Sequence, residues 1–110
     1  MAFTMVLTYR GEKDNAVCFA HEMMDSGIVE AIRKLDGCLM YTYYRSFDDP
    51  TMIILMDQWV DQAALDRYHQ SQLMEKVAAL REKYDLHVTA KRYIEDDLTM
   101  SHHDDRYLRP

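Results

Sequence analysis

Trp59 and His69 are the two side chains whose types and spacing most clearly suggest chemistry on a small molecule. Trp59 is the only tryptophan and ends the apolar stretch 51–59, and His69 follows ten residues later. An indole offers a flat apolar wall and one N–H donor. An imidazole, with a reference pKa of about 6.5, can accept a proton at neutral pH. We therefore predict that both line one cavity, with core packing as the alternative role for each.

Two tyrosines and an aspartate could add polar groups to that cavity. Tyr41 and Tyr43 share a face of the predicted strand 38–45, where a phenol either packs or donates a hydrogen bond. Asp57 shares a strand face with Trp59, so a regular strand would bury it and oblige it to find donors or to stay protonated. A β-bulge before Trp59 would instead turn Asp57 to solvent. The sequence leaves both orientations open.

Four strands and two helices are predicted to position these side chains. Apolar, aromatic and β-branched residues indicate strands at 3–9, 38–45, 51–59 and 86–94. Apolar residues at spacings of three and four indicate helices at 15–35 and 62–84. The order β-α-β-β-α-β predicts an α+β, ferredoxin-like fold, in which two helices cover one face of a four-stranded antiparallel sheet.

Each predicted helix has one feature that affects the site. Ser26-Gly27 interrupts the first and indicates a kink or a close approach to the sheet, because a glycine inside a helix costs about 1 kcal/mol relative to alanine. Asp61 is expected to cap the second helix. The inward stripe of that helix then includes His69, provided that the helix runs unbroken past Ser71.

The sheet face without helices predicts an oligomer. Strand 51–59 contains five consecutive apolar residues, 52–56, which suit a central strand with both faces covered. In a monomer the second face would be an apolar patch in water. We therefore expect a homodimer that packs sheet against sheet, a dimeric α/β barrel with one helix-to-sheet pocket in each chain.

Composition narrows the class of protein. The 110 residues suffice for one domain, expected over 1–94, followed by a polar C-terminal arm at 95–110. A formal net charge of -6 argues against nucleic acid or an anionic membrane as a partner. No apolar run approaches the length of a membrane span, and residues 1–10 lack the pattern of a signal peptide, so a cytoplasmic protein is expected.

Sequence patterns of metal and cofactor sites are missing. Cys18 and Cys38 lack zinc-site spacing and are expected to be reduced packing residues. His102–Asp105 contains metal-ligand types but lies in the polar arm, where a third element would be needed to fix a site. Without a glycine-rich phosphate loop, neither a nucleotide, a flavin nor a metal is expected as cofactor.

Three stretches resemble the antibiotic biosynthesis monooxygenase domain family, which includes quinol monooxygenases. They are MMDSGIVEAIRKLDGCLMYTYYRSFDDP, ILMDQWVDQAALDRYHQS and ALREKYDLHVTAKRY, within about Val6 to Ile94. The resemblance implies cofactor-free oxygenation of a quinol or similar electron-rich aromatic molecule. Once deprotonated, such a ring can give an electron to O2 itself, so the protein need only bind it, take a proton and exclude water.

The resemblance also assigns residues. The family's strand-end tryptophan matches Trp59, and its helix histidine matches His69 or, with the register shifted by one, Tyr68. His69 is then the catalytic base and Trp59 the wall against the ring. The expected substrate-binding residues are Tyr41, Tyr43, Asp57 and Tyr68. Haem degradation, also found in this family, is disfavoured because it needs an asparagine on the first strand, and the only asparagine is Asn15.

Two other functions remain open. A proton-shuttling isomerase of a small carbonyl compound would use the same base without consuming O2. A non-catalytic dimeric module for ligand binding or stress would instead have its cavity filled by flexible thioethers. The methionines expected there are Met23, Met24, Met56 and Met74.

Overall fold

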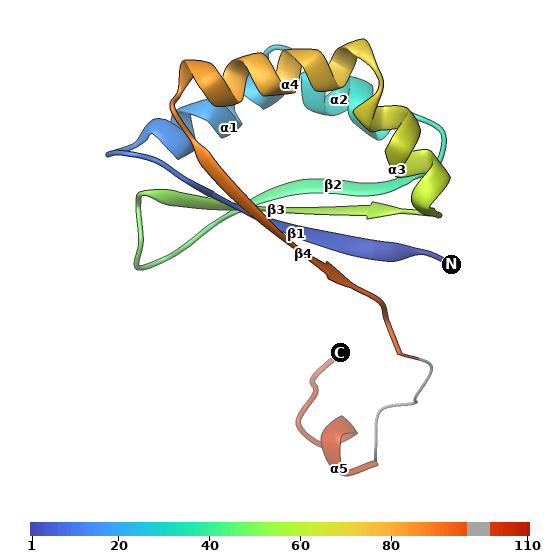
Figure 1. The fold of residues 1–110 in the computed structure, drawn as a ribbon. Helices are drawn as coiled ribbons and strands as arrows, with labels where there is room; N and C mark the ends of the chain where they lie inside the picture. The colour runs from blue at the N-terminus through green and yellow to red at the C-terminus, as the bar shows by residue number, and fades with distance from the viewer. Residues whose placement is uncertain (97–101) are drawn as a thin grey trace.

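The computed structural model describes residues 1–96 and 102–110, with a four-stranded sheet covered by helices on one face (Figure 1). The sheet is antiparallel throughout, and its spatial order is β2-β3-β1-β4. The strands are β1 (Phe3–Arg10), β2 (Cys38–Arg45), β3 (Met52–Trp59) and β4 (His87–Tyr93). The predicted α+β, ferredoxin-like class is confirmed. Within this chain the sheet is open and does not close into a barrel.

Strand β3 is central, as its apolar run predicted. Burial alternates strictly along it, because successive side chains of a strand point to opposite faces. Ile53, Leu55, Asp57 and Trp59 point toward the helices and are each at most 4% exposed. The pairing of β3 with β1 continues without a shift from one end to the other. This regular register determines which side chains reach the site.

The predicted helix over 15–35 is divided into α1 (Asn15–Asp25) and α2 (Ile28–Arg33). Gly27 separates them with a left-handed φ of 85°, a conformation that glycine adopts at little cost. Apart from its chain neighbours, no heavy atom of the described residues lies within 4 Å of where its Cβ would be. The interruption predicted at Ser26-Gly27 is therefore confirmed, whereas the suggested close approach to the sheet is wrong.

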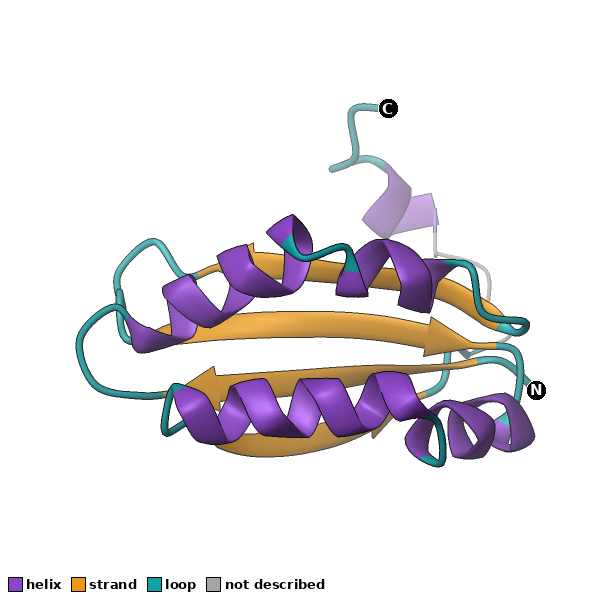
Figure 2. Ribbon diagram, turned by 90° about the horizontal axis from the view of Figure 1, so that it is seen from above, coloured by secondary structure: helices purple, strands orange, loops and turns teal. Residues whose placement is uncertain are grey.

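The predicted second helix is also divided, into α3 (Gln62–His69) and α4 (Gln72–Lys83). Asp61 caps α3 as expected, since its Oδ1 accepts a backbone N–H of the first turn at 2.9 Å. Ser71 caps α4 in the same way, its Oγ accepting a backbone N–H at 3.4 Å. Because Ser71 caps a new helix, the predicted second helix does not run unbroken past Ser71. Figure 2 shows α1 to α4 lying over the strands.

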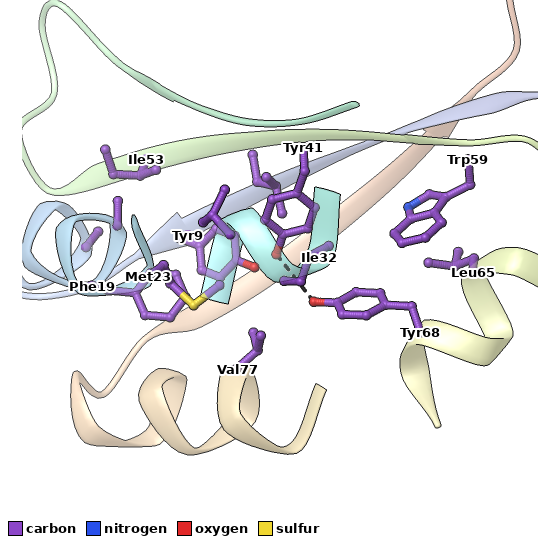
Figure 3. Packing of buried hydrophobic residues seen from close by; sticks show 14 of the residues in the cluster. Tyr9, Phe19, Met23, Ile32, Tyr41, Ile53, Trp59, Leu65, Tyr68 and Val77 are labelled. Carbon is purple, nitrogen blue, oxygen red and sulfur yellow. Dashed lines mark hydrogen bonds between the residues drawn. The ribbon is translucent and has the colours of Figure 1, made fainter. Parts of the chain in front are cut away.

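The core fills the space between the sheet and these helices (Figure 3). It is rich in aromatic side chains, whose burial stabilises a fold by about 1.5–3 kcal/mol each. Its largest fully buried members include Trp59, Tyr9, Tyr41, Phe3 and Phe19.

The opposite face of the sheet lies away from α1 to α4 (Figure 1) and carries an apolar patch at its centre. Val6 and Met56 are register partners on this face, and Ile54 lies beside them on β3. All three are partly exposed in the single chain. None of the described helices is long and apolar enough to span a membrane. The predicted arm at 95–110 contains the short helix α5 (His102–Asp105), and its residues 97–101 lie outside the described part of the chain.

Gly37 and Gly27 form a matched pair for testing how closely α3 packs on the turn before β2. Both have left-handed φ, but a Cβ at Gly37 would lie 2.5 Å from the Cβ of Ala64, whereas Gly27 has open space. We expect Gly37→Ala to lower the free energy of unfolding by about 2–4 kcal/mol, from overpacking and strain together. Gly27→Ala should cost about 1 kcal/mol from strain alone. Urea unfolding measures both, and equal losses would contradict the close packing.

Candidate functional site

A cavity of about 260 Å³ lies between the sheet and helices α3 and α4. All four strands and both helices contribute to its lining, so residues far apart in sequence meet there. A small apolar cavity with a few polar groups is typical of a small-molecule site. The lining residues with titratable side chains are Tyr41, Asp57, Tyr68, His69 and Arg81.

Asp57 is the buried acid of this cavity. It is 4% exposed, and its Oδ2 accepts a hydrogen bond from Trp59 Nε1 at 2.7 Å. The bulge that would have turned Asp57 to solvent is not found in β3. The register shift lies in β2 instead, between Cys38 and Met40. Burial raises the pKa of Asp57 to about 6, against the lowering effects of the Trp59 hydrogen bond and the more distant Arg81.

Tyr68 and Tyr41 form the aromatic wall. The ring of Tyr68 stacks on Trp59 with centroids 5.2 Å apart and planes inclined by 14°. Its hydroxyl lies 3.4 Å from that of Tyr41, a contact drawn in Figure 3. Burial raises the pKa of both phenols, that of Tyr68 to about 12. Both are therefore neutral at physiological pH and can donate hydrogen bonds to a ligand.

His69 lies at the rim of the cavity and not on the inward stripe, so that prediction is wrong. It is the last residue of α3 and is exposed, whereas Tyr68 is 4% exposed. The cap at Ser71 ends α3 here, and the buried face of this short helix passes through Leu65 and Tyr68. Partial burial lowers the pKa of His69, with Asp66 opposing the shift. A neutral imidazole at the mouth can still accept a proton.

Trp59 and Tyr43 lie outside the lining itself. Trp59 is fully buried and reaches the cavity through Asp57 and Tyr68, so the wall predicted for Trp59 is formed by the tyrosine stacked on it. Tyr43 packs edge-on against Tyr9 and Tyr41, at centroid distances of 6.2 and 5.9 Å. Its place in this aromatic cluster makes it a packing residue behind the site.

Arg81 of α4 is a lining residue that sequence reasoning missed. Its Nη2 donates to the hydroxyl of Tyr9 at 2.8 Å, and its guanidinium carbon lies 5.2 Å from the centre of that ring. Arg81 follows Val77 by four residues and so belongs to the inward stripe. That spacing was the available signal, but arginine is usually assigned to the solvent face.

Two polar atoms of opposite hydrogen-bonding character have no partner in this site. Asp57 Oδ1, an acceptor, and Arg81 Nε, a donor, are both buried without a hydrogen bond among the described residues. Leaving such a group unsatisfied costs about 1–3 kcal/mol, and more for a charged one. Both side chains line the same cavity. A ligand with complementary groups would satisfy both atoms.

The methionines expected to fill the cavity do not do so as a set. Met74 lines it, but Met23 is a fully buried core residue and Met24 is 45% exposed. Met56 points to the other face of the sheet, as its place between the inward residues of β3 requires. This part of the expectation for a non-catalytic module is wrong.

Metal-ligating side chains do not gather in the described residues. No group of three or more histidine, cysteine, aspartate or glutamate side chains is placed there to hold an ion. Cys18 and Cys38 are free thiols.

The sequence of this chain matches a recognised protein family. A family model described as antibiotic biosynthesis monooxygenase matches residues 3–80, which is more than half of the 110 residues. The chain therefore belongs to the antibiotic biosynthesis monooxygenase family, as its sequence resemblance indicated. A comparison with curated proteins gives no match.

Solved structures share this fold at low sequence identity. A presumed antibiotic biosynthesis monooxygenase from Deinococcus radiodurans superposes with a TM-score of 0.75 at 15% identity, over 92% of this chain and 98% of that one. SnoaB, a cofactor-independent oxygenase from Streptomyces nogalater, gives 0.72 at 13% identity, over 88% and 95%. PA3566 from Pseudomonas aeruginosa gives 0.72 at 22% identity, over 86% and 95%. These likenesses establish the fold.

The buried carboxylate predicts an unusual pH dependence of stability. Because the pKa of Asp57 in the folded chain, about 6, exceeds its ordinary 3.8, the folded state holds the proton more tightly. Stability therefore falls as the pH rises from about 4 to about 6, and the full cost of the ionised carboxylate is present above that range. We expect Asp57→Asn to raise the free energy of unfolding at pH 7.5 by up to about 3 kcal/mol, an advantage that disappears as the pH falls to about 4.

Denaturant unfolding across that pH range measures the effect. The exposed Asp36→Asn is the control, and it should leave the pH dependence unchanged. An Asp57→Asn variant that is less stable than the parent at pH 7.5 would contradict the assigned burial cost.

Proposed function

We propose that the chain is a cofactor-independent monooxygenase that uses O2 to oxidise a quinol or similar electron-rich aromatic molecule. The observation that carries this proposal is the combination, in one cavity, of a buried carboxylate, neutral phenols and an arginine within the antibiotic biosynthesis monooxygenase fold. SnoaB, which shares this fold, is a cofactor-independent oxygenase, and this supports the same class of reaction for the present chain.

The proposed oxidation needs no electrons or oxygen atoms beyond those of the substrate and O2. A quinol whose ring carries a C–H group can react with O2 to give a hydroxyquinone and water. One oxygen atom enters the ring, the other leaves as water, and the substrate provides all four electrons. The reaction begins when the quinol loses a proton, because its anion is a much stronger reductant than the neutral ring. No bound cofactor is then needed.

The residues of the cavity have separate roles in this proposal. The ring packs against Tyr68, which Trp59 holds in place by stacking. Tyr41 and Tyr68 donate to the oxygens of the ring, and the guanidinium of Arg81 offsets the negative charge that develops on them. The apolar remainder of the lining excludes water, which strengthens each of these electrostatic interactions.

His69 keeps its predicted role as a base, from a different position. At the mouth of the cavity a neutral imidazole can take up a proton that leaves the site and release it to solvent. Its lowered pKa favours the neutral, accepting form at pH 7. A proton-shuttling isomerase would use the same groups, and the consumption of O2 distinguishes the two reactions.

We also propose that two chains associate through the open sheet face. Val6, Ile54 and Met56 form an apolar patch on that face, and a second copy would remove it from water. Such an arrangement leaves the helix-to-sheet cavity of each chain separate. In a dimer with two-fold symmetry, the patch of one chain would pack against the same patch of the other.

Oxygen uptake tests the proposed reaction. With naphthalene-1,4-diol as substrate, the protein should consume O2 above the rate of spontaneous oxidation and form a hydroxyquinone that mass spectrometry identifies. His69→Ala and Trp59→Phe should each lower kcat/KM by about tenfold or more. His87→Ala, an exposed histidine at the start of β4, is the matched control. Unchanged uptake in both site variants would refute the assignment.

Sedimentation tests the proposed dimer. The parent should sediment at twice the chain mass of 13.1 kDa, and Ile54→Asp should sediment as a folded monomer because a carboxylate replaces an apolar contact. Met24→Asp, on the helical side, is the control and should remain dimeric. A parent that is monomeric at micromolar concentration would overturn the proposal.

A further inference from the structure

The residues that line the cavity include an acceptor and a donor that have no hydrogen-bond partner among the described residues. Asp57 is 96% buried, and only one of its two oxygens is used. Trp59 Nε1 donates to Oδ2, which holds the carboxylate in one orientation and leaves Oδ1 buried without a hydrogen bond among the described residues. Arg81 is fixed in a similar manner, because Nη2 donates to the Tyr9 hydroxyl while Nε has no partner in the part of the chain that the structure describes. Rigid, unpaired groups of this kind are suited to recognising a ligand.

Resting on the proposed function, we propose that Asp57 is the group that takes the substrate's proton. The substrate is a small planar ring that presents a hydroxyl to Oδ1 and a separate oxygen acceptor to Arg81 Nε. The O–H bond of the substrate breaks, an Oδ1–H bond forms, and the electron pair stays on the ring oxygen. Negative charge thus passes from the carboxylate to the ring, where Arg81 and the neutral phenols of the wall offset it.

The position of Asp57 suits proton transfer better than that of any other described lining residue. It is a buried carboxylate inside the cavity, whereas His69 is exposed at the rim. Its pKa of about 6 leaves it mostly ionised at pH 7 and a stronger base than an ordinary aspartate. His69 then acts after Asp57, by carrying the proton from the mouth to solvent.

The cavity also limits the size of the substrate. Small-molecule sites usually enclose about 300–1,000 Å³, and this cavity, at about 260 Å³, lies below that range. It therefore suits one ring or two fused rings. The substrate class is a monocyclic or bicyclic phenol or quinol with a second oxygen on the ring system.

Ligand binding tests this inference without requiring any oxidation. The probe pair is 4-hydroxyacetophenone and its methyl ether, 4-methoxyacetophenone, which share the ring and the carbonyl acceptor but differ in the hydroxyl donor. Isothermal titration calorimetry at pH 7 should show that the parent binds the phenol at least about tenfold more tightly. A site built to accept a hydroxyl discriminates strongly against an analogue that lacks it.

Variants locate the cause of the preference. Asp57→Asn should reduce it below about threefold, since the amide keeps an oxygen for Trp59 and then presents a donor to the cavity. His69→Ala should retain the full preference. Arg81→Met should weaken the binding of both ligands and keep their ratio. A preference that persists in Asp57→Asn would come from the size of the methyl group, and it would overturn the proposal, as would a parent without any preference.

Kinetics test the proton transfer itself. With naphthalene-1,4-diol, Asp57→Asn should lower kcat for O2 uptake by about 100-fold or more, as expected for the loss of a general base. Asp57→Asn with the parent's kcat would refute proton transfer to Asp57. If no quinol supports O2 uptake in the parent, the proposed oxygenation fails, whereas the binding preference still decides whether Asp57 recognises a hydroxyl.

Discussion

The hydrogen bond from Trp59 Nε1 to Asp57 Oδ2 is the interaction on which the site depends. A carboxylate in the helix-facing layer of β3 is costly, and a single indole donor offsets only part of that cost. The bond spans two residues of one strand, so it needs both side chains on the same face. The unbroken pairing of β3 with β1 provides this. A one-residue slip would turn both groups to the other face.

Helix ends determine which side chain of α3 enters the cavity. Ser71 begins α4 with its own cap, which leaves α3 only eight residues long and places Tyr68, not His69, against Trp59. Tyr41 lies edge-on to the Tyr68 ring of this stacked pair, and the two phenol hydroxyls are in contact. A titratable imidazole is thus left in contact with solvent, while neutral phenols line the interior. The helix cap at Ser71 therefore explains why phenols line the interior of the cavity and why the imidazole of His69 lies at its rim.

Much of the fold could be predicted from sequence, because strand alternation and helical periodicity record which face is buried. The arrangement of the site was harder to predict from sequence. Whether Asp57 faced inward depended on the position of a β-bulge, which sequence periodicity does not reveal and which the structure places in β2. His69 was misplaced because Ser71 reads equally well as a helical residue or as a cap. Arg81 was missed because its long side chain can turn toward a phenol as readily as toward water.

The single tryptophan of the chain has a further consequence. Its indole N–H donates to the buried carboxylate of Asp57 and its ring stacks on Tyr68. All tryptophan fluorescence of this protein therefore comes from a side chain in contact with Asp57. The charge of a hydrogen-bonded carboxylate perturbs the excited state of an indole. The chain therefore carries a built-in optical reporter of the ionisation of that carboxylate, which needs neither a label nor a substrate.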